Sequence, residues 1–248
     1  MSDGALSQNE INAMLKGEID LNAVSKDGDI PQDDINLLLN AIDVHEKKQT
    51  KDFSMENRQL RFSDAQLKKI ASIYENFAHM AMNCLSTVLR CPVQMRLDTI
   101  NQLTVGEVSR CIPTPTTLGF INMEPLKGGT NPVCAVIEID PNVTFAVIDI
   151  TRHGRTGMTN SYSVFTNFEI SIINNLFAYI LENMRLAWSG TINIQPKLCR
   201  LETDPKSIKI AAIHEMTALA TIAVKIMNID GMINFCIPFS VIEPVLDK

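Results

Sequence analysis

Apolar residues recur at helical spacing in two long segments of the chain, 63–89 and 165–188. Each segment opens with a Ser or Thr that is followed three residues later by Gln or Glu. In such a capping box the two side chains satisfy backbone groups of the first helical turn. The capping residues are Ser63 with Gln66 and Thr166 with Glu169. The pattern therefore predicts two long helices, the second ending near Trp188.

The other apolar segments are short, and most of them predict strands. Runs that alternate or stay apolar between Gly, Pro or polar residues are typical of strands. The predicted strands are 93–103, 117–126, 132–140, 191–202, 207–216, 219–229 and 232–239. A short helix or a turn is predicted at 104–112. Short helices are predicted at 141–150, with Asp140 as cap and Pro141 at the first position, and at 240–246. Asp230-Gly231 predicts the turn between the last two strands.

The order of a long helix, strands and a short helix occurs twice along residues 63–246. Two long helices over strands predict an α/β fold built in layers. The repeated order indicates a duplication, although the two halves share little sequence.

The first fifty residues carry one short pattern twice, as LSQNEINAML at 6–15 and IPQDDINLLL at 30–39. In each copy the apolar residues fall at i, i+3 and i+4, which is one stripe of a helix. The first copy provides Leu6, Ser7, Gln8, Glu10, Ile11, Met14 and Leu15, and the second provides Gln32, Asp34, Ile35, Leu38 and Leu39. Ser7 and Glu10 form a capping box, whereas Pro31 takes the place of Ser7 in the second copy.

Each of these helices would have about ten residues, fewer than the roughly 12–15 that a helix needs alone in water. They are therefore expected to order on another surface. That surface is either the chain's own domain or a partner protein. Repetition favours a partner, because a second copy of a docking peptide increases avidity.

All of the excess charge lies on the segment with the repeats. Residues 1–52 hold eleven acidic and five basic residues, whereas residues 53–248 hold seventeen of each. An acidic arm with apolar anchors suits a partner with a basic face and argues against nucleic acid. The alternative is a charged tail kept for solubility. We expect a largely disordered arm over 1–50 and a folded domain over 51–248.

The remaining composition indicates a cytoplasmic protein without a metal site or cofactor. No apolar run reaches the ~20 residues of a membrane span, and the N-terminus lacks the pattern of a secretion signal. The six cysteines form no CxxC pair, so buried free thiols are expected rather than disulfides or zinc. The four histidines are dispersed.

Several stretches resemble the flagellar motor switch protein FliM family. LSQNEINAML resembles the family's opening peptide, and RFSDAQLKKIASIYENFA resembles the entry to its middle domain. INQLTVGEVSRCIPTPTTLGFINMEPLKG, at 100–128, is the most specific stretch. It contains Gly106-Glu107, Pro113-Thr114-Pro115 and Met123-Glu124-Pro125-Leu126. FTNFEISIINNLFAYILENMRLAW and CIPFSVIEPV complete the resemblance.

The resemblance implies a three-layer α/β/α domain like that of CheC-type phosphatases. It also implies a scaffold in the switch ring of the flagellar basal body, on the inner face of the membrane. The implied partners are phosphorylated CheY-type regulator at the first peptide, FliG at the middle domain, and further FliM copies in the ring. Family members continue into a FliN-like domain that this sequence does not include, so a FliN contact stays open.

The family's GGxG loop, which contacts FliG, corresponds to residues after Asp149. Gly154 matches its second glycine, but His153 replaces the first, and Gly157 lies one position past the third. Arg152, His153 and Arg155 add bulk and charge. The loop therefore either loses the FliG contact or makes it with altered geometry.

The alternative function is a CheC-like phosphatase acting on the phosphorylated regulator. Such enzymes present Glu and Asn at ExxN spacing on a long helix. The residue three positions after the Glu is not Asn in this chain. It is Ala78 after Glu75, Ile172 after Glu169 and Arg185 after Glu182. The pair is missing from both helices, so we predict a protein without catalytic residues.

Overall fold

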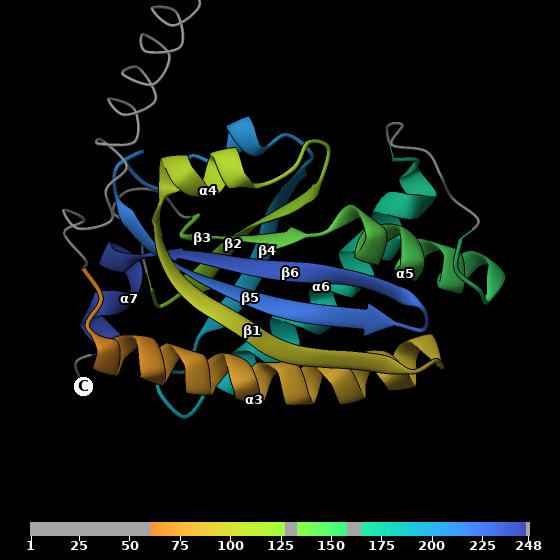
Figure 1. Cartoon of the computed structure of the whole chain (residues 1–248), viewed down its shortest axis with the longest axis horizontal. Coiled ribbons are helices and arrows are strands. Elements are labelled where there is room, and N and C mark those ends of the chain that lie inside the picture. Colours follow the sequence, from red (N-terminus) through yellow and green to blue (C-terminus); the bar gives the residue numbers. More distant parts are fainter. Residues whose placement is uncertain (1–60, 127–132, 158–164, 247–248) are drawn as a thin grey trace, which may run out of the picture. The chain divides into compact units, whose positions relative to one another are not determined.

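The structure is a computed structural model that describes residues 61–126, 133–157 and 165–246 of the chain (Figure 1). The two peptides at 6–15 and 30–39 lie outside the described residues, as do residues 127–132 at the junction of two predicted strands. The loop that resembles GGxG lies within them.

The described elements repeat one order. The first half contains α3 (Asp64–Leu89), β1 (Val93–Thr104), α4 (Val105–Cys111), β2 (Thr117–Glu124), β3 (Ala135–Ile139) and α5 (Pro141–His153). The second contains α6 (Asn167–Trp188), β4 (Gln195–Glu202), the 3₁₀ turn η3 (Pro205–Ser207), β5 (Met216–Ile226), β6 (Ile229–Pro238) and α7 (Phe239–Leu246).

The six strands form one sheet in the order β1-β5-β6-β3-β2-β4. Every neighbouring pair is antiparallel. β1, β2 and β3 of the first half correspond to β4, β5 and β6 of the second half. If each strand is replaced by its counterpart, the order read from one edge of the sheet becomes the order read from the other edge. The last strands of the two halves, β3 and β6, meet at the centre. The duplicated arrangement predicted from the order of elements is therefore present.

Helices cover both faces of the sheet (Figure 1). α3 and α6 pack against each other and against the face that carries Ile137 and Phe235. α4 covers part of the opposite face, where Val108 and Phe120 belong to a second, smaller apolar cluster. Because successive side chains of a strand point to opposite faces, the two clusters lie on the two sides of the sheet. The α/β/α fold is thus confirmed.

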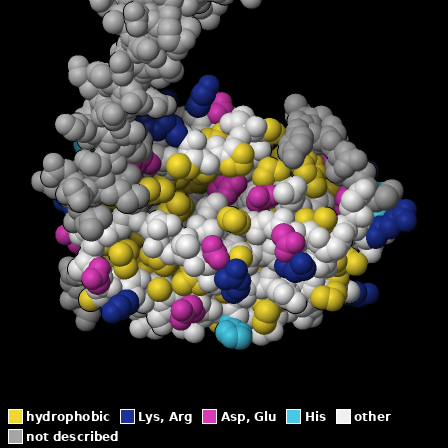
Figure 2. Space-filling view, in the orientation of Figure 1, with side chains coloured by type: hydrophobic (Ala, Val, Ile, Leu, Met, Phe, Trp, Pro, Cys, Tyr) yellow, Lys and Arg dark blue, Asp and Glu magenta, His cyan; other side chains and the backbone are white. Residues whose placement is uncertain are grey.

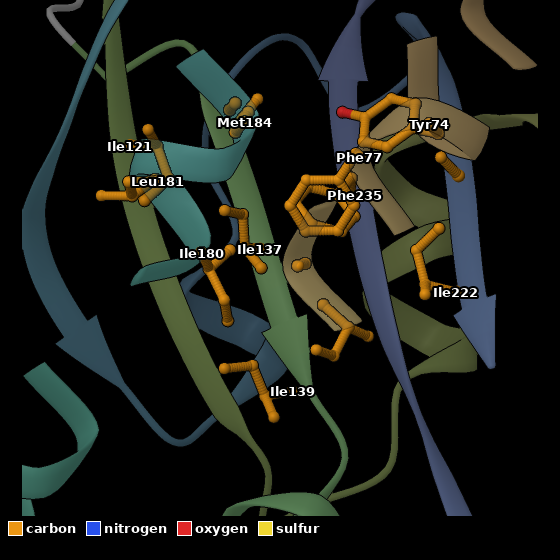
Figure 3. Close-up of a cluster of buried hydrophobic side chains, with 14 of the residues drawn as sticks. Tyr74, Phe77, Ile121, Ile137, Ile139, Ile180, Leu181, Met184, Ile222 and Phe235 are labelled. Atoms are coloured by element: carbon orange, nitrogen blue, oxygen red, sulfur yellow. The ribbon is translucent and has the colours of Figure 1, made fainter. Parts of the chain in front are cut away.

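Aromatic side chains from α3 and β6 lie at the centre of the larger cluster (Figure 3). The ring of Phe235 lies 4.8 Å from Tyr74 and 4.8 Å from Phe77, measured between ring centroids. Ile137 of β3 and Ile180 of α6 complete this part of the core, and both are fully buried. The core therefore joins the two halves.

The capping boxes predicted for the two long helices are both formed. The Ser63 hydroxyl accepts from the Gln66 amide at 3.3 Å, and the Gln66 side chain accepts from the Ser63 amide at 2.9 Å. Thr166 and Glu169 make the same exchange at the start of α6. Asp140 caps α5 as predicted.

The turn predicted at Asp230-Gly231 is wrong, because the strands turn at Met227 and Asn228. Gly231 lies within β6 opposite Val224. A Cβ atom at Gly231 would lie 2.7 Å from Cγ2 of Val143. This glycine thus permits the close approach of α5 and does not mark a turn.

The strand predicted at 207–216 is also wrong. This segment begins in η3 and continues without regular structure to Glu215. Its carbonyls bond to the start of α4, where Ile213 accepts from Gly106 at 2.9 Å and Glu215 accepts from Val105 at 3.0 Å. These carbonyls therefore bind N–H groups at the start of a helix and not a neighbouring strand. The alternation of side chains in the sequence does not reveal this.

Candidate functional site

The loop at 151–157 forms an exposed corner at the end of α5. Arg152 and His153 are the last residues of the helix, and Gly154 ends it with φ of 68°. Gly157 has φ of 83°. Both glycines thus take left-handed conformations that other residues rarely adopt. His153 occupies a helical position, so replacing glycine there leaves the backbone unstrained.

Contacts to two other segments fix the position of this loop. The Arg152 guanidinium lies 3.2 Å from a carboxylate oxygen of Glu169 and 5.7 Å from the ring centre of Phe168. The Thr156 hydroxyl donates to the Asn228 side chain at 3.0 Å. The loop is therefore held against the start of α6 and the turn between β5 and β6.

A pocket of about 330 Å³ lies between the start of α5, the start of α6 and the ends of β2 and β4. Its lining is mostly apolar. The lining residues are Pro115, Thr116, Thr117, Pro141, Phe145, Phe165, Ile170, Ile173, Leu201, Glu202 and Thr203. In the space-filling view, basic side chains lie where α5 ends, and hydrophobic side chains lie inward from them (Figure 2).

A buried carboxylate lies behind the pocket wall. Glu138 is 3% exposed, and its oxygens accept hydrogen bonds from the Thr116 hydroxyl and from the Asn234 amide, the latter at 2.7 Å. Burial raises the pKa of Glu138, and the nearby Asp140 adds to this, whereas the two hydrogen bonds act in the opposite direction. The folded protein therefore binds a proton at Glu138 more readily than the unfolded chain does.

We expect Glu138→Gln to change the dependence of stability on pH. Protonated Glu138 is favoured in the folded state, so the contribution of Glu138 to stability is fully present below the ordinary glutamate pKa of about 4.3 and is lost as pH rises through the raised pKa. The amide carries no charge and can keep both partners. Its stability relative to wild type should therefore increase with pH. Urea unfolding from pH 4 to 8 measures the difference, with exposed Glu124→Gln as control, and a difference independent of pH would contradict the assignment.

The residues that carry the family resemblance mainly build the fold. Glu107 accepts from the Thr104 amide at 2.8 Å and so completes a capping box at the start of α4. A Cβ atom at Gly106 would lie 2.7 Å from Ile213. The peptide bonds before Pro115 and Pro125 are cis. Among Gly106, Glu107, Pro115 and Pro125, only Pro115 borders the pocket.

Two of the three acidic residues compared with the phosphatase motif bind other side chains. Glu169 is bonded to the cap of α6 and to Arg152. Glu182 pairs with Arg185 at 2.6 Å. Glu75 is exposed, and the residue at the Asn position of the phosphatase motif, Ala78, is 2% exposed.

The described residues contain no group of three His, Cys, Asp or Glu that could hold a metal ion. Burial raises the pKa of Cys134 to about 11 and that of Cys236 to about 12. The expectation of buried thiols is wrong for Cys111 and Cys199, which are exposed. No helix within the described ranges is long and apolar enough to cross a membrane.

Residues 63–248, which are more than half of the chain, match the family described as flagellar motor switch protein FliM. The chain belongs to the FliM family. It is 34% identical over 246 residues to FliM of Borreliella burgdorferi and 34% identical over 229 residues to FliM of Treponema pallidum. These alignments cover 99% and 88% of the chain.

The chain spans 66% of the Borreliella FliM and 65% of the Treponema FliM, just under two thirds of each. A structural match is found in the FliG–FliM complex from H. pylori, with a TM-score of 0.70 and 24% identity. This match covers 75% of the chain and 100% of the matched chain. It supports the FliM middle-domain fold.

The structure thus describes one of the three segments predicted as binding sites, the loop at 152–157. It adds the pocket, which the sequence analysis missed because its walls come from segments up to 88 positions apart, Pro115 to Thr203. The sequence signal closest to it was Pro113-Thr114-Pro115, which we interpreted only as a family motif.

Proposed function

We propose that this chain is a non-enzymatic scaffold of the bacterial flagellar motor switch. In this proposal it lies at the cytoplasmic side of the basal body, next to further copies of itself in a ring. It binds a FliG-type partner through the middle domain and a phosphorylated CheY-type regulator through the arm. Regulator binding biases the arrangement of middle domains and so the direction of rotation.

The observation that carries the FliG-type contact is the exposed, fixed loop at 151–157. Two glycines allow a close approach of another backbone, and Arg152, His153 and Arg155 surround them with basic groups. Contacts to α6 and to the β5–β6 turn hold the loop before any partner binds, which reduces the entropy cost of association. The H. pylori FliM match, solved together with FliG, agrees with this role.

The arm supplies the regulator-binding part of the proposal. Ile11, Met14 and Leu15 would enter an apolar groove as one face of a short helix. Ile35, Leu38 and Leu39 would do the same in the second copy. Glu10, Asp33 and Asp34 would meet basic groups at the rim of the groove, consistent with the excess of acidic residues over 1–52.

Charge reversal at the loop tests the middle-domain contact. We expect Arg155→Glu to weaken binding of the FliG-type protein of the same organism by about three- to tenfold, with a reduced dependence on salt, since an exposed charge at an interface acts mainly on association. Arg155 is chosen because Arg152 also stabilises the start of α6.

Calorimetry with the full chain measures this effect. Arg110→Glu is the matched control, because Arg110 is exposed and lies in α4, at the opposite side of Figure 1 from the end of α5. Absence of binding by the wild-type chain, or equal losses in the two variants, would contradict the proposed contact.

A further inference from the structure

The two halves of the domain place corresponding aromatic residues at two corners. Phe62 directly precedes Ser63, the cap of α3, and Phe165 directly precedes Thr166, the cap of α6. Phe62 is 3% exposed and packs edge-to-face on Phe239, with ring centres 4.8 Å apart. The first corner is therefore filled by the chain itself.

The residue that holds the first corner closed is Gln102 of β1. Its side-chain oxygen accepts from the Phe62 amide at 3.0 Å, and its side-chain nitrogen donates to the Phe62 carbonyl at 2.9 Å. This side chain thus uses both a donor and an acceptor to bind the backbone that enters α3. An amide side chain provides the donor and the acceptor that these two bonds require.

Glu202 occupies the corresponding position in the second half. Gln102 stands two residues before Thr104, which caps α4, and Glu202 stands two residues before Asp204, which caps η3. Each lies near the end of the first strand of its half. A carboxylate can only accept hydrogen bonds, so Glu202 cannot hold a backbone segment as Gln102 does.

Among the described residues, the second corner is filled less completely. Phe165 is half-buried, its ring centre lies 6.0 Å from that of Phe145, and the pocket of about 330 Å³ lies between these rings and Glu202. Ile170, which forms one wall, is 37% exposed, and Phe168 beside it is 57% exposed. An apolar pocket with a few polar groups is the arrangement of a binding site. The polar groups here include the Glu202 carboxylate, which also lies 3.6 Å from Nε of Arg200.

We propose that this pocket receives an apolar side chain from the FliG-type partner, whose backbone N–H donates to the Glu202 carboxylate. The proposal rests on the proposed function and extends that contact from the loop into the pocket. The loop and the pocket share the start of α6, because Arg152 bonds to Glu169 and the next residue, Ile170, lines the pocket. The bound segment therefore carries an apolar anchor next to acidic residues that face Arg152 and Arg155.

The volume and lining select an aliphatic or aromatic anchor. Pockets of about 300–1,000 Å³ accommodate whole small ligands, so this one has room for one large side chain and part of its backbone. Burying such an anchor in an apolar pocket is a common source of binding energy in protein interfaces. The basic rim adds selectivity for an acidic neighbour.

Substitution of the exposed pocket wall tests the proposal. We expect Ile170→Asn to weaken binding of the FliG-type protein of the same organism at least tenfold by calorimetry. Leu186→Asn is the matched control on the same helix, because Leu186 is 42% exposed and is not among the residues lining the pocket. In a second measurement, the δ1 methyl resonances of Ile170 and Ile173 should shift when the partner is titrated into the wild-type chain.

The outcomes separate the two proposals. If the wild-type chain binds and Arg155→Glu weakens binding, but Ile170→Asn binds normally and the methyl resonances do not move, the pocket proposal is wrong and the loop contact stands. If the wild-type chain does not bind, the proposed function fails. If Ile170→Asn changes only self-association in sedimentation, the occupant is a second copy of this chain and the pocket proposal is overturned.

Discussion

Removal of residues 1–42 is expected to abolish activation-dependent binding of the CheY-type regulator, because both copies of the repeated peptide are lost. Calorimetry with the regulator in its activated and unactivated forms, against the full chain and the shortened one, measures the effect. The full chain should bind only the activated form tightly, at one or two regulators per chain. If the shortened chain still binds the regulator, the repeated peptides are not the binding site and instead pack on their own domain.

The two copies should contribute unequally to this binding. Ile11→Ala is expected to weaken it more than Ile35→Ala, since Ser7 and Glu10 cap the first helix and Pro31 leaves the second without that cap. Loss of a cap costs about 1 kcal/mol, which corresponds to roughly a fivefold change in affinity when the helix folds on binding. Equal losses in the two variants would contradict the ranking.

The largest effect on stability is expected from Phe235→Ala, at about 3–5 kcal/mol of unfolding free energy. Phe235 is fully buried and contacts two aromatic rings of α3, so its removal leaves a cavity between the helix and the sheet (Figure 3). Urea unfolding can be followed by the fluorescence of Trp188, which is the single tryptophan and is fully buried.

Met232→Ala is the control for this substitution. Met232 lies on the same strand, three residues before Phe235, and is 46% exposed. We expect a change of no more than about 0.5 kcal/mol there, because few of its contacts are lost. A similar loss in both variants would show that the aromatic cluster is not the centre of the core.

The sequence predicted those parts of the fold that are encoded locally. Ser63 with Gln66 and Thr166 with Glu169 lie within one helical turn, so their capping follows from spacing alone. The order of elements likewise predicted the layers and the duplication. The apolar pattern did not predict which strands of the two halves pair with each other, because that depends on contacts between distant segments.

The errors have the same physical cause. Gly231 suggested a turn, but the glycine is required by the side chain of Val143, which comes from another element. Residues 207–215 alternate like a strand, yet their carbonyls bond to the start of α4. Glu202 of the pocket lining stands where the other half has Gln102, and this comparison requires the two halves to be aligned by structure.

The order of strands in the sheet has a consequence for how the domain folds and how it arose. β1 pairs with β5 of the other half, and β4 pairs with β2, so each half gives its first strand to its counterpart. Neither half can complete its own sheet, and the two must fold as one cooperative unit. The domain thus has the topology of a swapped homodimer whose two chains have been fused into one. An ancestral single half would have been stable only as a pair.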